Sequence, residues 1–136
     1  RDTLRLEAAM PLYGHELDDK IDPLSAGQAW CVDLKKEFIG VEPLRKIAEA
    51  GSEYQLVGLE LAGRRIARQG TQISDGSDTI GRITSGTFSP TLQKSIALGY
   101  VRRGASAVGT KLTVALSGQP AEATIVEIPF YKRPKP

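Results

Sequence analysis

The stretch IGRITSGTFSPTLQKSIALGYV, residues 80–101, decides the fold of this chain. A strand-like run opens it and leads into a tight bend at residues 84–86, which a loop of small residues follows. A second apolar run, residues 96–101, carries the chain away from that loop. Apolar and β-branched runs separated by Gly, Ser and Pro are typical of strands joined by turns. We therefore predict two strands here, and the absence of a reactive pair of side chains indicates an architectural role.

The chain on both sides of this stretch repeats the pattern of short strands and turns. Residues 54–62 alternate strongly, and the Asp75-Gly76 pair is a tight-turn signal. Five or six strands at such regular spacing predict a small antiparallel barrel or sandwich, and closure into a barrel removes exposed strand edges. The strands predicted by pattern are 54–62, 79–84, 96–101, 111–116 and 121–128, the last two joined by a short hairpin connection at 117–119.

Residues 1–51 are instead predicted to be helical and irregular. An amphipathic helix begins at Arg1 and ends near Met10, because Pro11 lacks a backbone donor and restricts the residue before it. The same patterns predict a short helical turn over 22–27, a strand over 29–34 and a helix over 41–50 that ends at Gly51.

Composition limits the possible functions. The chain has 136 residues, 40% of them hydrophobic, and a net charge of +2 from 18 basic and 16 acidic side chains. This balance argues against a nucleic-acid or membrane partner, and no apolar run approaches the roughly 20 residues that span a bilayer. A single cysteine excludes an internal disulfide framework, which leaves the reducing cytosol as the default location. Because the chain starts at Arg1 within a helical run, we interpret it as a domain whose N-terminal neighbour is missing.

Few side chains carry reactive chemistry. His15 is the only histidine and Cys31 the only cysteine, so a zinc site with several such ligands cannot form. We expect Cys31 to be buried beside Trp30, as free cysteines usually are. Three hydroxyl side chains occupy every second position of residues 85–89. Because no base in the chain is available to activate them, we expect them to be turn hydroxyls and not nucleophiles. They belong to Ser85, Thr87 and Ser89.

Arg1 and Arg5 lie four residues apart and therefore on one side of the predicted helix. A guanidinium is a fixed fork of donors suited to a carboxylate or a planar polar heterocycle. Asp2 and Glu7 could hold such an arginine in place. Spacing alone favours plain salt bridges over contact with a ligand.

Four motifs closely resemble the glycine cleavage T-protein family of aminomethyltransferases. Residues 1–19, RDTLRLEAAMPLYGHELDD, are similar to the family's RD(T/S)LRLEAG run followed by LYG, and residues 85–101 nearly match its SGTFSPTLGKxIALAYV pattern. Residues 22–40 resemble its DPLEAGLGW segment with the following FIG helix start, and IPFYKR at 128–133 resembles a bacterial C-terminal segment. The resemblance covers essentially the whole chain but only the C-terminal part of the family.

This resemblance implies a mainly β fold with a helical N-terminal segment: a six-stranded antiparallel Greek-key β-barrel over residues 52–136. Residues 1–51 would continue from a missing N-terminal folate-binding domain, which carries the catalytic aspartate in this family. The resemblance further implies that Arg1 holds the cofactor tetrahydrofolate and that Tyr131 lies close to it, with no catalytic residue and no metal in this chain. Ala9 and Gln93 stand where the family has glycine, so we expect slight local differences in the backbone.

The activity that the resemblance implies is that of the complete T-protein. It transfers the one-carbon unit from the aminomethyl-lipoyl arm of its partner, the lipoylated H-protein, to tetrahydrofolate and releases ammonia. We expect the fragment alone to be inactive, and we expect a bacterial cytoplasmic location. Two alternatives remain: the C-terminal domain of a related folate-dependent demethylating enzyme, and a non-catalytic barrel module that binds a protein partner.

Overall fold

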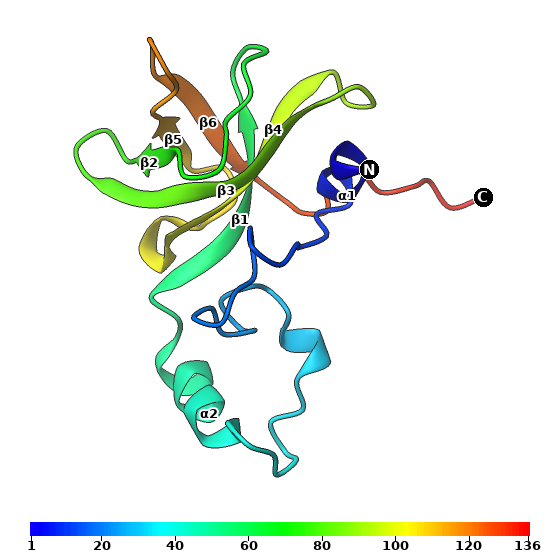
Figure 1. Ribbon diagram of the computed structural model, residues 1–136, viewed down its shortest axis with the longest axis vertical. Helices are drawn as coiled ribbons and strands as arrows, with labels where there is room; N and C mark the ends of the chain where they lie inside the picture. The colour runs from blue at the N-terminus through cyan, green and yellow to red at the C-terminus, as the bar shows by residue number, and fades with distance from the viewer.

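The computed structural model describes all residues 1–136 and contains a closed antiparallel β-barrel with the strand order β1-β4-β3-β2-β5-β6 (Figure 1). Strands β2, β3 and β4 are consecutive hairpin neighbours, and β1 pairs with β4, which is a Greek-key arrangement. The predicted six-stranded barrel is therefore confirmed. The strands are β1 (Tyr54–Leu61), β2 (Gln72–Ser74), β3 (Thr79–Ser89), β4 (Lys94–Arg102), β5 (Lys111–Val114) and β6 (Ala121–Val126).

Strand β3 does not bend away at residues 84–86, so the predicted bend is wrong. The strand continues to Ser89, and its pairing with β4 shifts between Ile83 and Ser85. Such a shift is a β-bulge, in which one extra residue locally kinks a strand without ending it. Beyond the bulge, alternate side chains of β3 again point to one face.

The barrel encloses one apolar core, and a second, smaller cluster lies outside it. Val57, Leu59 and Leu61 of β1 belong to the thirteen-residue core cluster, whereas Leu56 belongs to the outer cluster of five residues. Strand β4 is buried on both faces, since its alternate residues contribute to both clusters. This explains why residues 96–101 form a continuous apolar run and not an alternating one.

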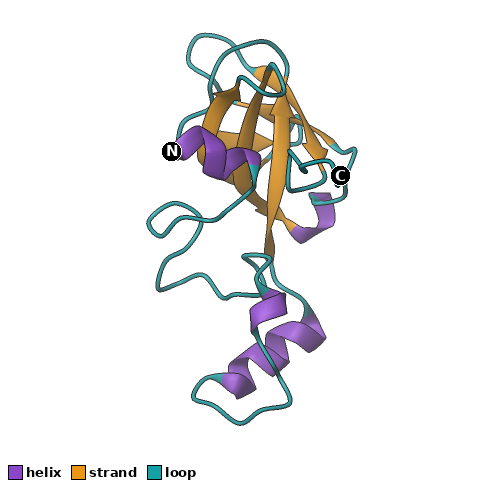
Figure 2. Cartoon of the chain, turned by 90° about the vertical axis from the view of Figure 1, so that its right-hand side faces the viewer, coloured by secondary structure: helices purple, strands orange, loops and turns teal.

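The outer cluster is covered by the two ends of the chain. The helix α1 (Asp2–Glu7) contributes the fully buried Leu6, and the C-terminal segment contributes Phe130. Figures 1 and 2 show α1 against the barrel wall, while α2 (Val41–Ala50) lies beyond one end of the barrel. No helix of the chain is long and apolar enough to cross a membrane.

Parts of the first 51 residues differ from the pattern-based prediction. The segment predicted as a strand at 29–34 contains only the 3₁₀ turn η1 (Ala29–Cys31), and both Trp30 and Cys31 are exposed. A strand needs an edge to pair with, and the closed barrel offers none. The helix α2 is confirmed with the predicted bounds, and Gly51 follows it with a φ of 83°.

The helix α1 ends at Glu7, three residues before the predicted end. Ala9 has a φ of 52°, which takes the chain out of the helix before Pro11 is reached. Gln93, the other residue that stands where the resembled family has glycine, has a φ of 54°. Both therefore occupy the left-handed region in which glycine is favoured. The remaining 3₁₀ turn is η2 (Arg103–Ala105).

Candidate functional site

The helix α1 sits on a row of hydroxyl groups along one face of β3. Three of its side chains, at alternate positions, each contact one hydroxyl of this row, so the expectation of turn hydroxyls is wrong. These hydroxyls belong to a strand and bind a helix. The three pairs are Thr3 with Thr87 (3.2 Å), Arg5 with Ser85 (2.9 Å) and Glu7 with Ser89 (2.5 Å).

The most connected of these side chains is Arg5. Its Nε donates to Asp2 Oδ1 over 2.7 Å, and its Nη1 donates to Glu16 Oε2 over 3.1 Å. Glu16 is fully buried, and the Arg5 side chain is 12% exposed. The predicted pairing of an arginine with Asp2 is confirmed, whereas Glu7 takes no part and Glu16 takes its place. Sequence reasoning missed Glu16 because it lies in a segment whose composition is typical of a loop.

Glu16 is satisfied on both carboxylate oxygens. Thr84 Oγ1 donates to Oε1 over 2.7 Å, and the Leu12 backbone N–H donates to Oε2 over 3.0 Å. The Tyr100 hydroxyl donates to the Glu16 backbone carbonyl over 2.8 Å. Burial, and after it the negative charge of Glu16, raises the pKa of Tyr100 well above its usual value. The network therefore joins α1, the 10–17 loop, β3 and β4 through fully paired polar groups.

We expect Tyr100 to remain neutral when exposed tyrosines ionise. An unfolded chain ionises this phenol near pH 10, about the unperturbed value, whereas the folded chain does not. Stability from this group is thus complete below about pH 10 and falls as the pH rises further. In an ultraviolet titration of tyrosinate, native protein and Tyr100→Phe should show the same absorbance change up to about pH 11. If the absorbance change of Tyr100→Phe in that range were smaller than that of the native protein by the contribution of one tyrosine out of four, the assignment would be contradicted.

The two residues predicted to bind the cofactor lie at opposite ends of α1. Arg1 is the exposed residue before the helix, and its guanidinium has no acidic partner. Tyr131 donates its backbone N–H to the Glu7 carbonyl over 2.9 Å, and the residue is 41% exposed. With a rise of 1.5 Å per residue, the helix separates the two ends by roughly 9 Å. An unpaired cation and the backbone of Tyr131 therefore lie at the two ends of one short helix.

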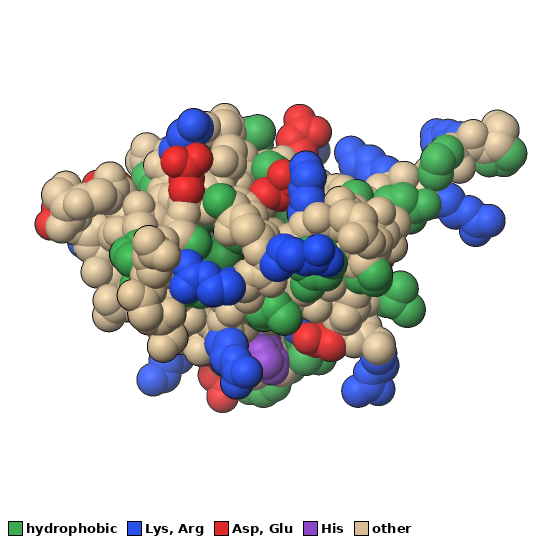
Figure 3. Space-filling model, turned by 90° about the horizontal axis from the view of Figure 1, so that it is seen from above, with side chains coloured by type: hydrophobic (Ala, Val, Ile, Leu, Met, Phe, Trp, Pro, Cys, Tyr) green, Lys and Arg blue, Asp and Glu red, His purple; other side chains and the backbone are tan.

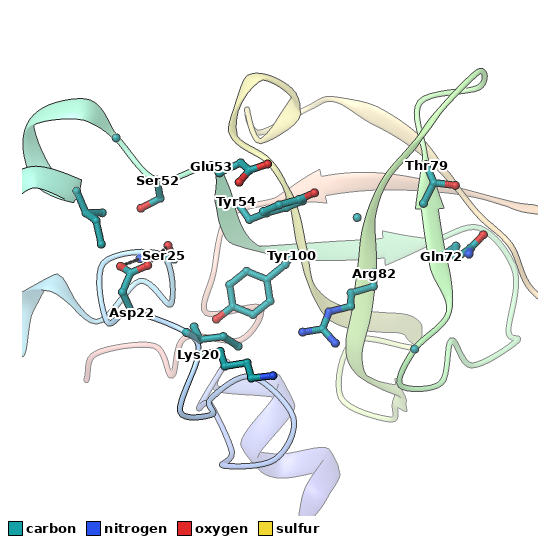
Figure 4. Close-up of a pocket in the computed structure, with 15 residues that line it drawn as sticks. Lys20, Asp22, Ser25, Ser52, Glu53, Tyr54, Gln72, Thr79, Arg82 and Tyr100 are labelled. Carbon is teal, nitrogen blue, oxygen red and sulfur yellow. Dashed lines mark hydrogen bonds between the residues drawn. The ribbon is translucent and has the colours of Figure 1, made fainter. Parts of the chain in front are cut away.

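A separate cavity of about 710 Å³ lies between the barrel and the segments 20–25 and 47–54. Figure 4 shows Lys20 and Arg82 beside the ring of Tyr100, while Asp22 and Glu53 line the same space. Neither Arg1 nor Tyr131 lines it. Its lining carries both signs of charge, so its electrostatics do not select an anion or a cation.

No group of three or more His, Cys, Asp or Glu side chains comes together in a way that could hold a metal ion. His15 is half-buried, with its Nδ1 3.1 Å from the Thr84 carbonyl oxygen, and Cys31 lies far along the chain in an exposed turn. On the face shown in Figure 3, basic and acidic side chains are interspersed.

Comparison with known proteins places this geometry in a family. Residues 55–132, which include most of the barrel and the segment that returns to α1, match the model of the glycine cleavage T-protein C-terminal barrel domain. The chain belongs to this family. The part of the chain that matches the T-protein barrel domain is the closed six-stranded barrel described above. The match extends past β6 and includes Tyr131.

Relatives of known name agree with this assignment. The chain is 54% identical to an aminomethyltransferase of Desulforamulus reducens over 98% of its length, and 50% identical to one of Synechococcus elongatus over 97%. The crystal structure of the glycine cleavage system aminomethyltransferase T from Bartonella henselae superposes with a TM-score of 0.90 at 30% identity and covers 96% of the chain. This chain spans only 36–37% of the length of these relatives. The homologues are therefore aminomethyltransferases, and the T-protein match is to their C-terminal part.

Proposed function

We propose that this chain is the C-terminal part of a tetrahydrofolate-dependent aminomethyltransferase of the glycine cleavage system. The complete enzyme would transfer the one-carbon unit from the aminomethyl-lipoyl arm of the H-protein to tetrahydrofolate and release ammonia. The observation that carries this proposal is the 54% identity to a named aminomethyltransferase over nearly the whole chain. The location that we propose is the bacterial cytoplasm, and the relatives named above are bacterial proteins.

Arg1 and Tyr131 are the residues that we propose for the cofactor site. The Arg1 guanidinium is solvent-facing and without an acidic partner, so its donors are available to a carboxylate or a polar heterocycle. The half-exposed Tyr131 can stack or donate from its hydroxyl. Tetrahydrofolate supplies the nitrogen atoms that accept the one-carbon unit. The side chains of this chain would bind and orient the cofactor, which makes a two-body encounter local.

The division of labour between this chain and the rest of the enzyme is also part of the proposal. We place the catalytic aspartate and most of the folate pocket in an N-terminal domain, as the resemblance to the T-protein family implies, and the chain's coverage of only 36–37% of its relatives supports this. Residues 1–51 would continue from that domain, and residues 52–136 would form the C-terminal barrel domain. Residues 1–136 alone are then expected to be inactive.

The alternative function, a non-catalytic barrel module that binds a protein partner, has one observation in its favour. Trp30 is 82% exposed, and Ile39 is fully exposed in the same segment that lies beyond the barrel. The relatives named aminomethyltransferase favour the enzyme over this module and over a demethylating enzyme. A test of folate binding distinguishes the aminomethyltransferase from the protein-binding module, since such a module does not need to bind folate.

We expect Arg1→Ala to weaken folate binding without unfolding the barrel. Loss of one charged hydrogen bond should raise the Kd of 5-formyltetrahydrofolate about tenfold in calorimetric titration of the complete protein. Arg1 lies outside the barrel, so the circular dichroism spectrum should not change. Arg68→Ala, at another exposed arginine, is the matched control and should bind like the native protein. Equal affinity of native protein and Arg1→Ala would remove Arg1 from the site.

A further inference from the structure

Polar contacts, more than apolar burial, hold α1 on the barrel. The helix has six residues, and of its two leucines Leu6 is fully buried whereas Leu4 is 70% exposed. Isolated helices this short are not stable in water. The position of α1 therefore depends on the side chains that connect it to β3 and to the 10–17 loop.

Two of the carboxylates in these contacts are buried, one in α1 itself and one in the 10–17 loop. Glu7 is 4% exposed and accepts from the hydroxyls of Ser89 and Thr91 at the end of the helix. Glu16 is fully buried and accepts from Arg5, one helical turn after Arg1. A buried carboxylate without partners is costly, so each one strongly favours the placement of α1 that satisfies it.

Arg5 connects Glu16 to the start of the helix. Its guanidinium uses all three nitrogens: Nε on Asp2, Nη1 on Glu16 and the Met10 carbonyl, and Nη2 on Ser85. Its backbone N–H donates to the Arg1 carbonyl over 3.1 Å. Because a guanidinium is planar and its donors are fixed, a slide or rotation of α1 would break several of these bonds together.

We propose that Glu16, acting through Arg5, is a positioning residue that sets where Arg1 presents its guanidinium to tetrahydrofolate. Glu16 itself does not touch the cofactor, since it is enclosed by Arg5, Thr84 and the Leu12 backbone. The inference rests on the proposed function, because it assigns Arg1 the role of a folate ligand. The inference adds Glu16 to the residues that determine cofactor binding. Glu16 lies 15 residues after Arg1, in a segment with no local signal of burial.

Glu16→Gln in the complete protein tests this proposal. The substitution keeps the size of the side chain but turns an amide N–H₂ group or a neutral oxygen toward Arg5. We expect the calorimetric Kd of 5-formyltetrahydrofolate to rise by up to about tenfold, because a displaced Arg1 would lose its own charged hydrogen bond to the cofactor. The kcat at saturating tetrahydrofolate should change by less than about twofold, because only cofactor placement is altered. Glu60→Gln, which removes the half-exposed pair with Lys94, is the matched control and should leave the Kd unchanged.

The outcomes separate positioning from a merely structural role. Partial unfolding would lower the number of binding sites in the titration and leave the Kd of the folded fraction at the native value, and that result would overturn the proposal. If Glu16→Gln does not fold, Ser85→Ala decides, since it removes one neutral partner of Arg5: a roughly threefold higher Kd supports positioning, and a native Kd overturns it. If the native complete protein does not bind 5-formyltetrahydrofolate, the proposed function fails first, and the inference fails with it.

Discussion

Arg5→Met is expected to lower the free energy of unfolding of this chain by about 3 kcal/mol, the range found when one member of a buried ion pair is removed. Glu16 is fully buried, so without Arg5 its charge keeps only the Thr84 hydroxyl and the Leu12 N–H as partners. Methionine has a similar reach and a good helix propensity, so the change chiefly reports the lost guanidinium. Urea-induced unfolding followed by circular dichroism measures the effect.

A second substitution shows whether the unpaired carboxylate causes the loss. Arg5→Met/Glu16→Gln removes both charges and leaves an amide whose oxygen accepts from the Leu12 N–H, while its NH₂ group can donate to Thr84 Oγ1, which still donates to the Leu98 carbonyl. The double variant should therefore be more stable than Arg5→Met. Arg45→Met is the control at a partly exposed arginine that pairs with the exposed carboxylates of Glu37 and Glu42, and it should cost less than about 1 kcal/mol. If Arg5→Met and Arg45→Met lowered the free energy of unfolding by similar amounts, the ion pair between Arg5 and Glu16 would contribute no more than a solvent-exposed pair.

The barrel was predictable because its signals are local. Alternation in residues 54–62 and turn residues between the runs identify strands before any contact is known. The strand β2 was missed because it has three residues, too few for a periodic pattern, and it is defined by its pairing with β3 and β5. The number of strands could therefore be bounded from sequence, but the shortest one could not be located.

The errors at residues 29–34 and 84–86 share a physical cause. Trp30, Val32 and Leu34 alternate as in a strand, but alternation produces a strand only where an unpaired edge is available. Ser85 and Gly86 have the composition of a turn, yet tertiary packing keeps them within β3. Local propensity is a weak prior in both segments because long-range contacts decide the outcome.

The polar contacts that hold α1 on the barrel could not be derived from sequence spacing. Glu16 lies 11 residues from Arg5 and 68 residues from Thr84, so nothing near it in sequence indicates that it is buried. The stretches that contain these residues are among those that resemble the T-protein family, but a resemblance by itself says nothing of which polar side chains pair. Arg1 and Tyr131 were proposed from that resemblance, and their roles remain predictions for the folate titrations.

Gly86→Ala is expected to destabilise the barrel by about 3 kcal/mol, at the upper end of the usual cost of overpacking. A Cβ on Gly86 would lie 2.0 Å from the backbone oxygen of Ala67, far inside any normal contact. Ala67 is 1% exposed, and the loop before it is tied to β4 by the Ser95 hydroxyl, which donates to the Arg65 carbonyl over 2.6 Å. Neither backbone can move away without opening the β3–β4 wall or the core beneath it.

The matched control is Gly104→Ala, at a glycine of η2 where an added Cβ would meet no atom within 4 Å. Its free energy of unfolding should stay within about 0.5 kcal/mol of the native value, as for surface substitutions without special features. If Gly86→Ala and Gly104→Ala unfold at the same urea concentration, the crossing of residue 67 over β3 is not as close as the structure shows. A large loss for Gly86→Ala alone would mean that this glycine is required by the approach of a second backbone, and not by a turn.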